Sequence, residues 1–212
     1  RRRIEGKIAG LKEKMSKDDP SHDINHALRV LTISEKIATA EKADFDIIVP
    51  SAVFHDIISY PKNHHKRLHS SKESAEFAKR ILKNIKSFPK EKIGKVYESI
   101  NLCSFTKGLK PNFLEGKILQ DADSLEATGA VSIMRTFSSA GMMNKTFYDV
   151  SDPFCKKRKP DDSKYALDLF FTRLLVVQSR LHTKTAKNIA KKRANFLKAF
   201  LKELKVELLE NI

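Results

Sequence analysis

A histidine and an aspartate, His55 and Asp56, stand side by side within the apolar segment 47–58. Burying a carboxylate among such residues costs free energy unless a cation neutralises it. Imidazole nitrogen and carboxylate oxygen are both ligands for divalent metals, so we expect a metal ion to be the neutralising partner. The sequence offers further ligands at two other places: His26, and either Asp121 or Asp123.

A shared metal requires these ligands to lie on elements that meet, and the residues around His26 have a helical pattern. From residue 24 to about residue 40, apolar side chains fall on more than one face, which predicts a widely buried helix with His26 pointing inward. A buried histidine taken alone is more often a hydrogen-bonded core residue, but the downstream His-Asp pair favours a ligand. His22 lies one turn earlier and would line the same side.

The His-Asp pair would belong to a helix with Asp44 or Asp46 as its N-cap. Pro50 would be tolerated in its first turn, where amide donors are unpaired anyway, and the helix would end near residues 60–61. The residues that follow could form a phosphate-binding rim: Lys62, His64, His65, Arg67 and His69. A hydrophilic surface loop is the alternative for the first two of these histidines.

One helix, from about residue 113 to about residue 138, would carry both Asp121 and Asp123. At about 100° per residue their carboxylates stand roughly 200° apart, so only one of them can easily meet the same metal. Further helices are expected over residues 4–17, 70–87 and 90–104, and two long helices should follow residue 163. With no alternating strand pattern, the sequence predicts an all-α fold.

Length and composition suit a folded enzyme. The 212 residues include only seven glycines and seven prolines, and Cys103 and Cys155 have neither metal-finger spacing nor the density of a secreted scaffold. No apolar run approaches the roughly 20 residues that span a bilayer, so we expect no membrane span and a cytoplasmic location. The formal charge of +15 attracts anions such as nucleic acid and phosphorylated metabolites.

Three segments carry a resemblance to a known family: residues 22–30 (HDINHALRV), 113–125 (FLEGKILQDADSL) and 129–137 (GAVSIMRTF). They resemble the HD superfamily of metal-dependent phosphohydrolases, and especially its small single-domain bacterial members suspected of acting on nucleotides. The resemblance implies an HD-domain helical bundle with long C-terminal helices. We therefore divide the chain into a basic amphipathic helix (1–20), the metal-binding core (21–140), an irregular loop or lid (141–162) and C-terminal helices that complete the domain (163–212).

The resemblance also implies roles for individual residues. HD hydrolases carry their last ligand in an Ala-Asp-x-Leu setting, which selects Asp123 and leaves Asp121 as an outer group or a partner of Arg135. The implied metal ligands are His26, His55, Asp56 and Asp123. The implied catalytic carboxylates are Asp56 and Asp121, and the candidates for contacts with phosphate or with the ligands are His22, Lys62, His69 and Arg135.

The chain departs from the family pattern at several positions. Cys103 stands where relatives carry a histidine, and Ser124 and Glu126 replace an arginine and an aspartate. A His-Phe-x-x-Lys pattern becomes Leu169-Phe-Phe-Thr-Arg173. These departures leave the expected metal ligands intact and concern the substrate and the rate.

We predict a metal-dependent phosphohydrolase, slowed by these departures, that acts on a small phosphorylated metabolite, most simply a nucleotide, as a pyrophosphohydrolase or phosphatase. The mixed nitrogen and oxygen ligands suit Mn²⁺, Mg²⁺, Ni²⁺, Co²⁺ or Fe²⁺. The alternative is a catalytically weak, metal-retaining protein that binds nucleotide or nucleic acid. A di-iron oxygenase that recruits His64, His65 and His69 is a third, less favoured hypothesis, and a homodimer could form through the C-terminal helices.

Overall fold

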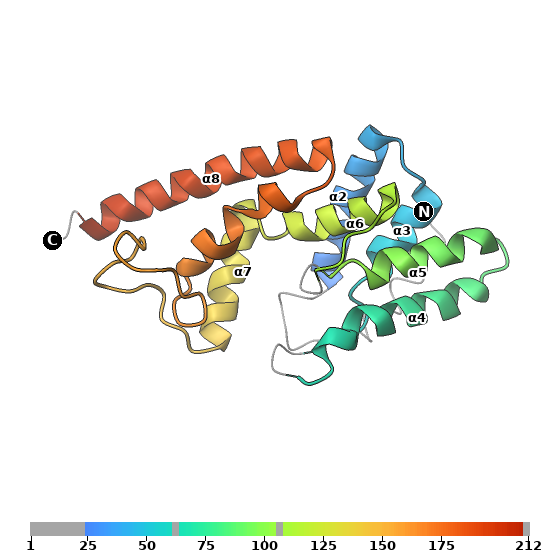
Figure 1. Ribbon diagram of the computed structural model, residues 1–212, viewed down its shortest axis with the longest axis horizontal. Helices are drawn as coiled ribbons and strands as arrows, with labels where there is room; N and C mark the ends of the chain where they lie inside the picture. The colour runs from blue at the N-terminus through green and yellow to red at the C-terminus, as the bar shows by residue number, and fades with distance from the viewer. Residues whose placement is uncertain (1–23, 61–63, 105–107, 210–212) are drawn as a thin grey trace. The chain divides into compact units, whose positions relative to one another are not determined.

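The computed structural model of the chain describes residues 24–60, 64–104 and 108–209 (Figure 1). Over these residues the regular elements are helices, and an isolated bridge between Thr146 and Tyr165 is the only β pairing. The predicted all-α class is therefore confirmed. The helix expected over residues 4–17 and the candidates His22 and Lys62 lie outside the described residues. In the part of the chain that is described, no helix combines the length and apolarity needed to cross a membrane.

Contacts divide the chain into two compact units, with the boundary between Asp123 and Ser124. The described α-helices that begin in the first unit are α2 (Ile24–Glu41), α3 (Phe45–Phe54), α4 (Ser70–Lys83), α5 (Ile93–Asn101) and α6 (Leu114–Leu125). Helix α3 packs against both α2 and α5, and α4 packs against α5. Fully buried aliphatic side chains from these helices, such as Val30, Ile48 and Ile118, form the core that fixes where the polar residues of α2, α3 and α6 meet.

Helix α3 shows how the sequence places the His-Asp pair. Asp44 is its N-cap, because its carboxylate accepts the N–H of Asp46 at 2.9 Å. Pro50 lies inside the helix and not in its first turn, and the helix ends at Phe54, earlier than predicted. Residues 55–58 form turns, and the N–H of Ile57 bonds to the carbonyl of Phe54 at 3.3 Å. The His-Asp pair therefore occupies a turn directly after a buried helix.

The single helix expected from residue 113 to 138 is two helices in the structure. Helix α6 ends at Leu125, and α7 begins at Gly129 and runs to Met142. Gly129 has a φ of 73°, which side chains rarely adopt, and a Cβ there would lie 3.1 Å from Cγ of Arg193. Arg193 donates a 2.7 Å bond to the carbonyl of Leu125. The break thus combines a positive-φ glycine with a hydrogen bond from a residue far along the chain.

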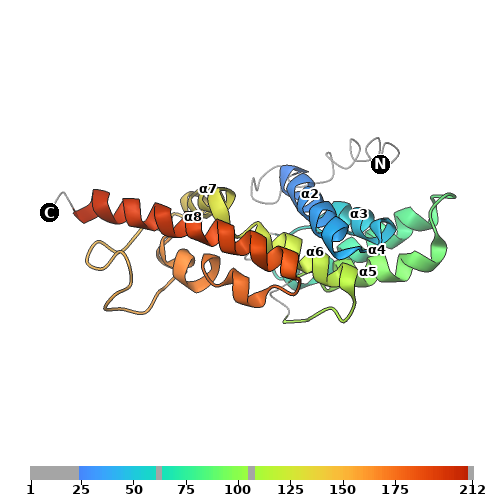
Figure 2. The ribbon, with the colours of Figure 1, turned by 90° about the horizontal axis from the view of Figure 1, so that it is seen from above.

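The second unit packs α7 against α8 (Lys184–Leu209), as Figure 2 shows. Its core contains Leu167, Phe170, Leu174 and Leu197. The first of the two expected C-terminal helices is present in irregular form: Phe170–Leu174 is a π-helical turn and Val177–Arg180 a 3₁₀ turn. The long α8 was predicted correctly.

The irregular segment between α7 and Phe170 is held by a buried carboxylate. Asp168 is fully buried and accepts hydrogen bonds from both terminal nitrogens of Arg158, at 2.5 and 2.8 Å. The N–H of Asp161 and the thiol of Cys155 also donate to it, at 2.6 and 3.3 Å. Burial alone would raise the pKa of Asp168, but these donors hold it below its ordinary value. The segment is therefore irregular but well bonded.

Candidate metal centre

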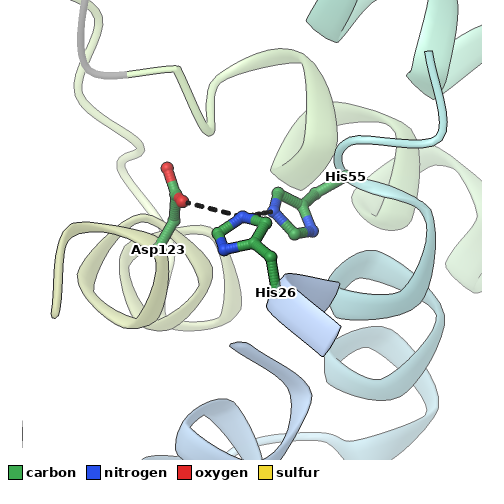
Figure 3. A group of neighbouring side chains, drawn as sticks. All are labelled: His26, His55 and Asp123. Carbon is green, nitrogen blue, oxygen red and sulfur yellow. Dashed lines mark hydrogen bonds and ion pairs between the residues drawn. The ribbon is translucent and has the colours of Figure 1, made fainter. Parts of the chain in front are cut away.

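Three elements of the first unit bring potential metal ligands together (Figure 3). His26 comes from α2, His55 follows α3, and Asp123 lies near the end of α6. The Nε2 atoms of the two histidines are 3.2 Å apart, and Asp123 Oδ1 is 3.6 Å from His26 Nε2. The ligand atoms of all three residues lie within 4.8 Å of one another.

The backbone orients the ring of His55. Its Nδ1 lies 2.8 Å from the carbonyl oxygen of Ala52, which can only accept, so we assign the proton to Nδ1. In the neutral ring, Nε2 then carries a lone pair that faces His26. A hydrogen bond of this kind fixes tautomer and orientation in metal-binding histidines.

Asp56 adds a second carboxylate to the group. Its Oδ2 is 3.7 Å from His26 Nε2 and 3.9 Å from His55 Nε2. The His26 side chain is fully buried, whereas the side chains of Asp56 and Asp123 are 25% and 32% exposed. The imidazoles therefore form the buried side of the group, and the carboxylates form the side open to solvent.

This set of atoms fits a divalent cation. Two ligands about 2.1 Å from one ion, at tetrahedral or octahedral angles, are separated by roughly 3.0–3.4 Å. The 3.2 Å between the histidine Nε2 atoms falls in that interval, and the carboxylate distances of 3.6–3.9 Å lie slightly above it. The lone pair of His55 Nε2 and the two carboxylates, in a largely buried place, favour a positive charge among them.

A cysteine lies close to the same carboxylates. Cys103 is 3% exposed, in the turn that follows α5. Burial raises the pKa of its thiol well above the ordinary value, and the charges of Asp123 and Asp56 raise it further. At neutral pH the group is a neutral thiol, which is a weak hydrogen-bond donor. It supplies neither a cation nor a good acid beside these carboxylates.

Comparison with known proteins identifies the family. The HD domain model matches residues 23–128, which include α2 to α6 and all four residues of the group. The chain belongs to the HD-domain family. A Bacillus subtilis protein, YpgQ, is 30% identical over 198 residues, covering 92% of this chain and 88% of YpgQ.

Solved structures agree with this assignment. The Bacillus subtilis YpgQ complex with ADP has a TM-score of 0.72 at 26% identity, covering 97% of this chain and 95% of YpgQ. An HD-superfamily hydrolase from Bacillus thuringiensis has a TM-score of 0.71 at 25% identity, covering 97% and 96% of the two chains. The structural similarity extends over nearly the whole of this chain, and the chain has the fold of HD-superfamily hydrolases.

The remaining predicted site residues lie in different surroundings. Asp121 is 1% exposed on α6, and His69 is exposed at the end of the 3₁₀ turn Arg67–His69. Arg135 lies on α7 in the second unit, with Nη1 3.8 Å from Oε2 of the buried Glu126. Glu126, one of the departures from the HD pattern, therefore lies within ion-pair distance of an arginine.

Two contacts of the HD domain escaped prediction. The bond from His55 to the Ala52 carbonyl spans three residues, a spacing that the sequence could have suggested. The hydrogen bond from Arg193 to the Leu125 carbonyl joins residues 68 positions apart, and no nearby sequence feature predicts it. Leu169, another departure from the family pattern, is partly buried against the core of the second unit, so packing accounts for an apolar residue there.

Proposed function

We propose that this HD protein is a metal-dependent phosphohydrolase that acts on a small phosphorylated metabolite, and that this metabolite is a nucleotide. The observation that carries the proposal is the convergence of two imidazole nitrogens and two carboxylates, partly open to solvent, inside an HD domain. The solved complex of the relative YpgQ with ADP supports a nucleotide as the ligand.

His26, His55, Asp56 and Asp123 would hold the metal. A bound divalent ion would lower the pKa of a water molecule, polarise phosphorus and neutralise charge on the phosphate oxygens. The Ala52 carbonyl would keep the Nε2 lone pair of His55 directed at the site. The partly exposed carboxylates would face the substrate, because the imidazoles are buried behind them.

Asp56 and Asp121 stay our candidates for proton transfer. Asp56 combines partial exposure with proximity to both histidine Nε2 atoms, so its carboxylate could accept a proton from a water near the ligands. Asp121 is buried two residues before Asp123, and we assign it a supporting role. The proposed phosphate contacts remain His22, Lys62, His69 and Arg135.

A second candidate function is supported by Cys103. A neutral thiol beside the carboxylates would be a poor replacement for a histidine that donates to phosphate. Loss of a general acid or base typically costs roughly 10²–10⁴-fold in rate. The alternative is therefore a catalytically weak HD protein that retains its metal and binds nucleotide or nucleic acid.

An activity screen separates these proposals. Purified protein would be assayed with Mn²⁺, Mg²⁺, Ni²⁺, Co²⁺ and Fe²⁺ against nucleoside mono-, di- and triphosphates and phosphate esters, with phosphate and pyrophosphate measured separately. We expect slow, metal-dependent release that the variant Asp123→Asn abolishes. If no metal supports release from any substrate, the binding-protein alternative replaces the enzyme.

A further inference from the structure

Three aromatic rings shortly after the His-Asp pair stack in a column. The rings of Tyr60 and His64 are nearly parallel, at 8°, with centroids 4.8 Å apart. His65 stacks on His64 with centroids 4.4 Å apart and an angle of 25°. A hydrophilic surface loop needs no such order, so the column requires an explanation of its own.

Hydrogen bonds hold the rings of Tyr60 and His64 in place. The Tyr60 hydroxyl donates to Glu73 Oε2 on α4 at 2.7 Å. The backbone N–H of Lys66 donates to Nδ1 of His64 at 3.1 Å. Two members of the column are therefore fixed by groups outside it, which lowers the entropy cost of using the column as a binding surface.

The outer ring is available for a ligand. His65 is exposed, and within the described part of the chain its only ring contact is with His64. Tyr60 follows the candidate ligand Asp56 by four residues, so the two Cα atoms are at most about 14 Å apart. The column therefore begins close in sequence to the candidate ligands, and the ring of His65 lies two stacking distances, 4.8 and 4.4 Å, beyond Tyr60.

We propose that the column Tyr60, His64 and His65 is the base-binding platform of this protein, with the nucleobase stacking on His65. The inference rests on the proposed nucleotide function and deepens it by naming the base subsite. Because every base has a π-face, stacking tolerates all bases. A purine, with two fused rings, covers more of the platform than a pyrimidine and binds more tightly.

The test measures binding without turnover. Calorimetry with Mn²⁺ would compare α,β-methylene-ADP with methylenediphosphonate, which has the phosphonate groups but no base. His65→Ala should weaken the nucleotide analogue roughly 5- to 150-fold, the range that corresponds to stacking of one base on an aromatic ring. Binding of methylenediphosphonate should not change. His65→Phe should retain nucleotide binding, because it restores a ring.

Leu68→Ala is the matched control, since Leu68 is exposed in the same loop and lies outside the column. It should bind both probes like the wild type. Equal loss of both probes in His65→Ala, unchanged nucleotide binding, or no nucleotide binding by the wild type overturns the platform. If the wild type hydrolyses nucleotides but His65→Ala binds the analogue normally, only the platform is refuted. If His65→Ala weakens analogue binding but the wild type hydrolyses nothing, only the enzyme function is refuted.

Discussion

The Nε2 atoms of His26 and His55 lie 3.2 Å apart, and the carbonyl oxygen of Ala52 fixes the tautomer of the His55 ring. Either a ring proton or a metal ion can bridge two nitrogens at this distance. The two nearby carboxylates favour a divalent ion over a single proton, because they carry two negative charges.

The first prediction concerns metal content. Purified protein should contain close to one divalent ion per chain, and His55→Ala and Asp123→Asn should lose it. Substituting a ligand should cost more than the roughly 10- to 100-fold affinity loss that follows removal of an outer partner. Elemental analysis after dialysis measures this. Asp121→Asn should keep the ion. If Asp121→Asn loses the ion and Asp123→Asn keeps it, the metal ligand is Asp121 and not Asp123.

The second prediction concerns the cysteine near the site. Cys103→His should raise metal-dependent turnover, by up to roughly 10²–10⁴-fold where the ring reaches phosphate, because an imidazole can donate a proton at neutral pH. The larger side chain in a buried position should lower stability by about 1–3 kcal/mol. Initial rates and urea unfolding give the two quantities. Cys103→Gln, similar in bulk but unable to titrate, should show no gain; an equal gain would exclude acid catalysis.

The sequence predicts those parts of the candidate site that depend on neighbouring residues alone. His55 and Asp56 adjoin in a hydrophobic run, and helical geometry separates Asp121 from Asp123. What could not be read is geometry set by tertiary packing. The exposed fractions that place imidazoles behind carboxylates, and the stacking of Tyr60 on His64, depend on how α3 and α4 pack.

At the scale of elements, helices whose ends carry local signals were predicted well. Asp44 caps α3, and α2 and α8 follow their apolar patterns. The errors fall where a distant residue decides the backbone. Helix α6 stops at Leu125, whose carbonyl accepts a hydrogen bond from Arg193. Residues 170–174 widen into a π turn and residues 177–180 tighten into a 3₁₀ turn, with Phe170 packed in the core.

The third prediction tests the break between α6 and α7. Gly129→Ala should lower the free energy of unfolding by about 1–3 kcal/mol, because a left-handed residue with a Cβ costs roughly 1–2 kcal/mol and the Arg193 side chain must also shift. Denaturant unfolding measures the loss. Gly141→Ala is the matched control on the same helix, where a Cβ meets nothing within 4 Å. It should be neutral or stabilise by up to about 1 kcal/mol. Similar losses in both variants would refute the role of Arg193.

The fourth prediction concerns the buried carboxylate of the irregular segment. Because the folded pKa of Asp168 lies below 3.8, its contribution to stability is complete above that pH and is lost as the pH falls through the folded value. Asp168→Asn should therefore destabilise the protein at pH 7, by about 3 kcal/mol for a broken buried pair.

The difference between this variant and the wild type should shrink below pH 3.8, as urea unfolding at several pH values can show. Glu91→Gln serves as the control, since Glu91 is exposed and the substitution is the same carboxylate-to-amide change. A constant difference across the whole pH range would mean that the carboxylate charge of Asp168 contributes nothing.

At the scale of the whole molecule, the candidate metal centre does not explain the net charge of +15. The basic run 156–159 is less available than its sequence suggests, because Arg158 is committed to the buried Asp168. Outside that run, lysines fall mostly at polar positions of helices. A field of this kind attracts polyanions without reading their sequence.

The fifth prediction follows from that distribution. Binding to duplex DNA should be weak, roughly 10⁻⁴–10⁻⁶ M at physiological salt, with about 0.9 added to the slope of log K against log salt for each phosphate neutralised. Fluorescence anisotropy over a salt series, with two oligonucleotides of unrelated sequence, measures both quantities. Equal affinities and a steep salt dependence would identify a general cationic surface. Nanomolar, sequence-selective binding at physiological salt would instead make nucleic acid the principal ligand, and the metal centre would then act on a polynucleotide and not on a free nucleotide.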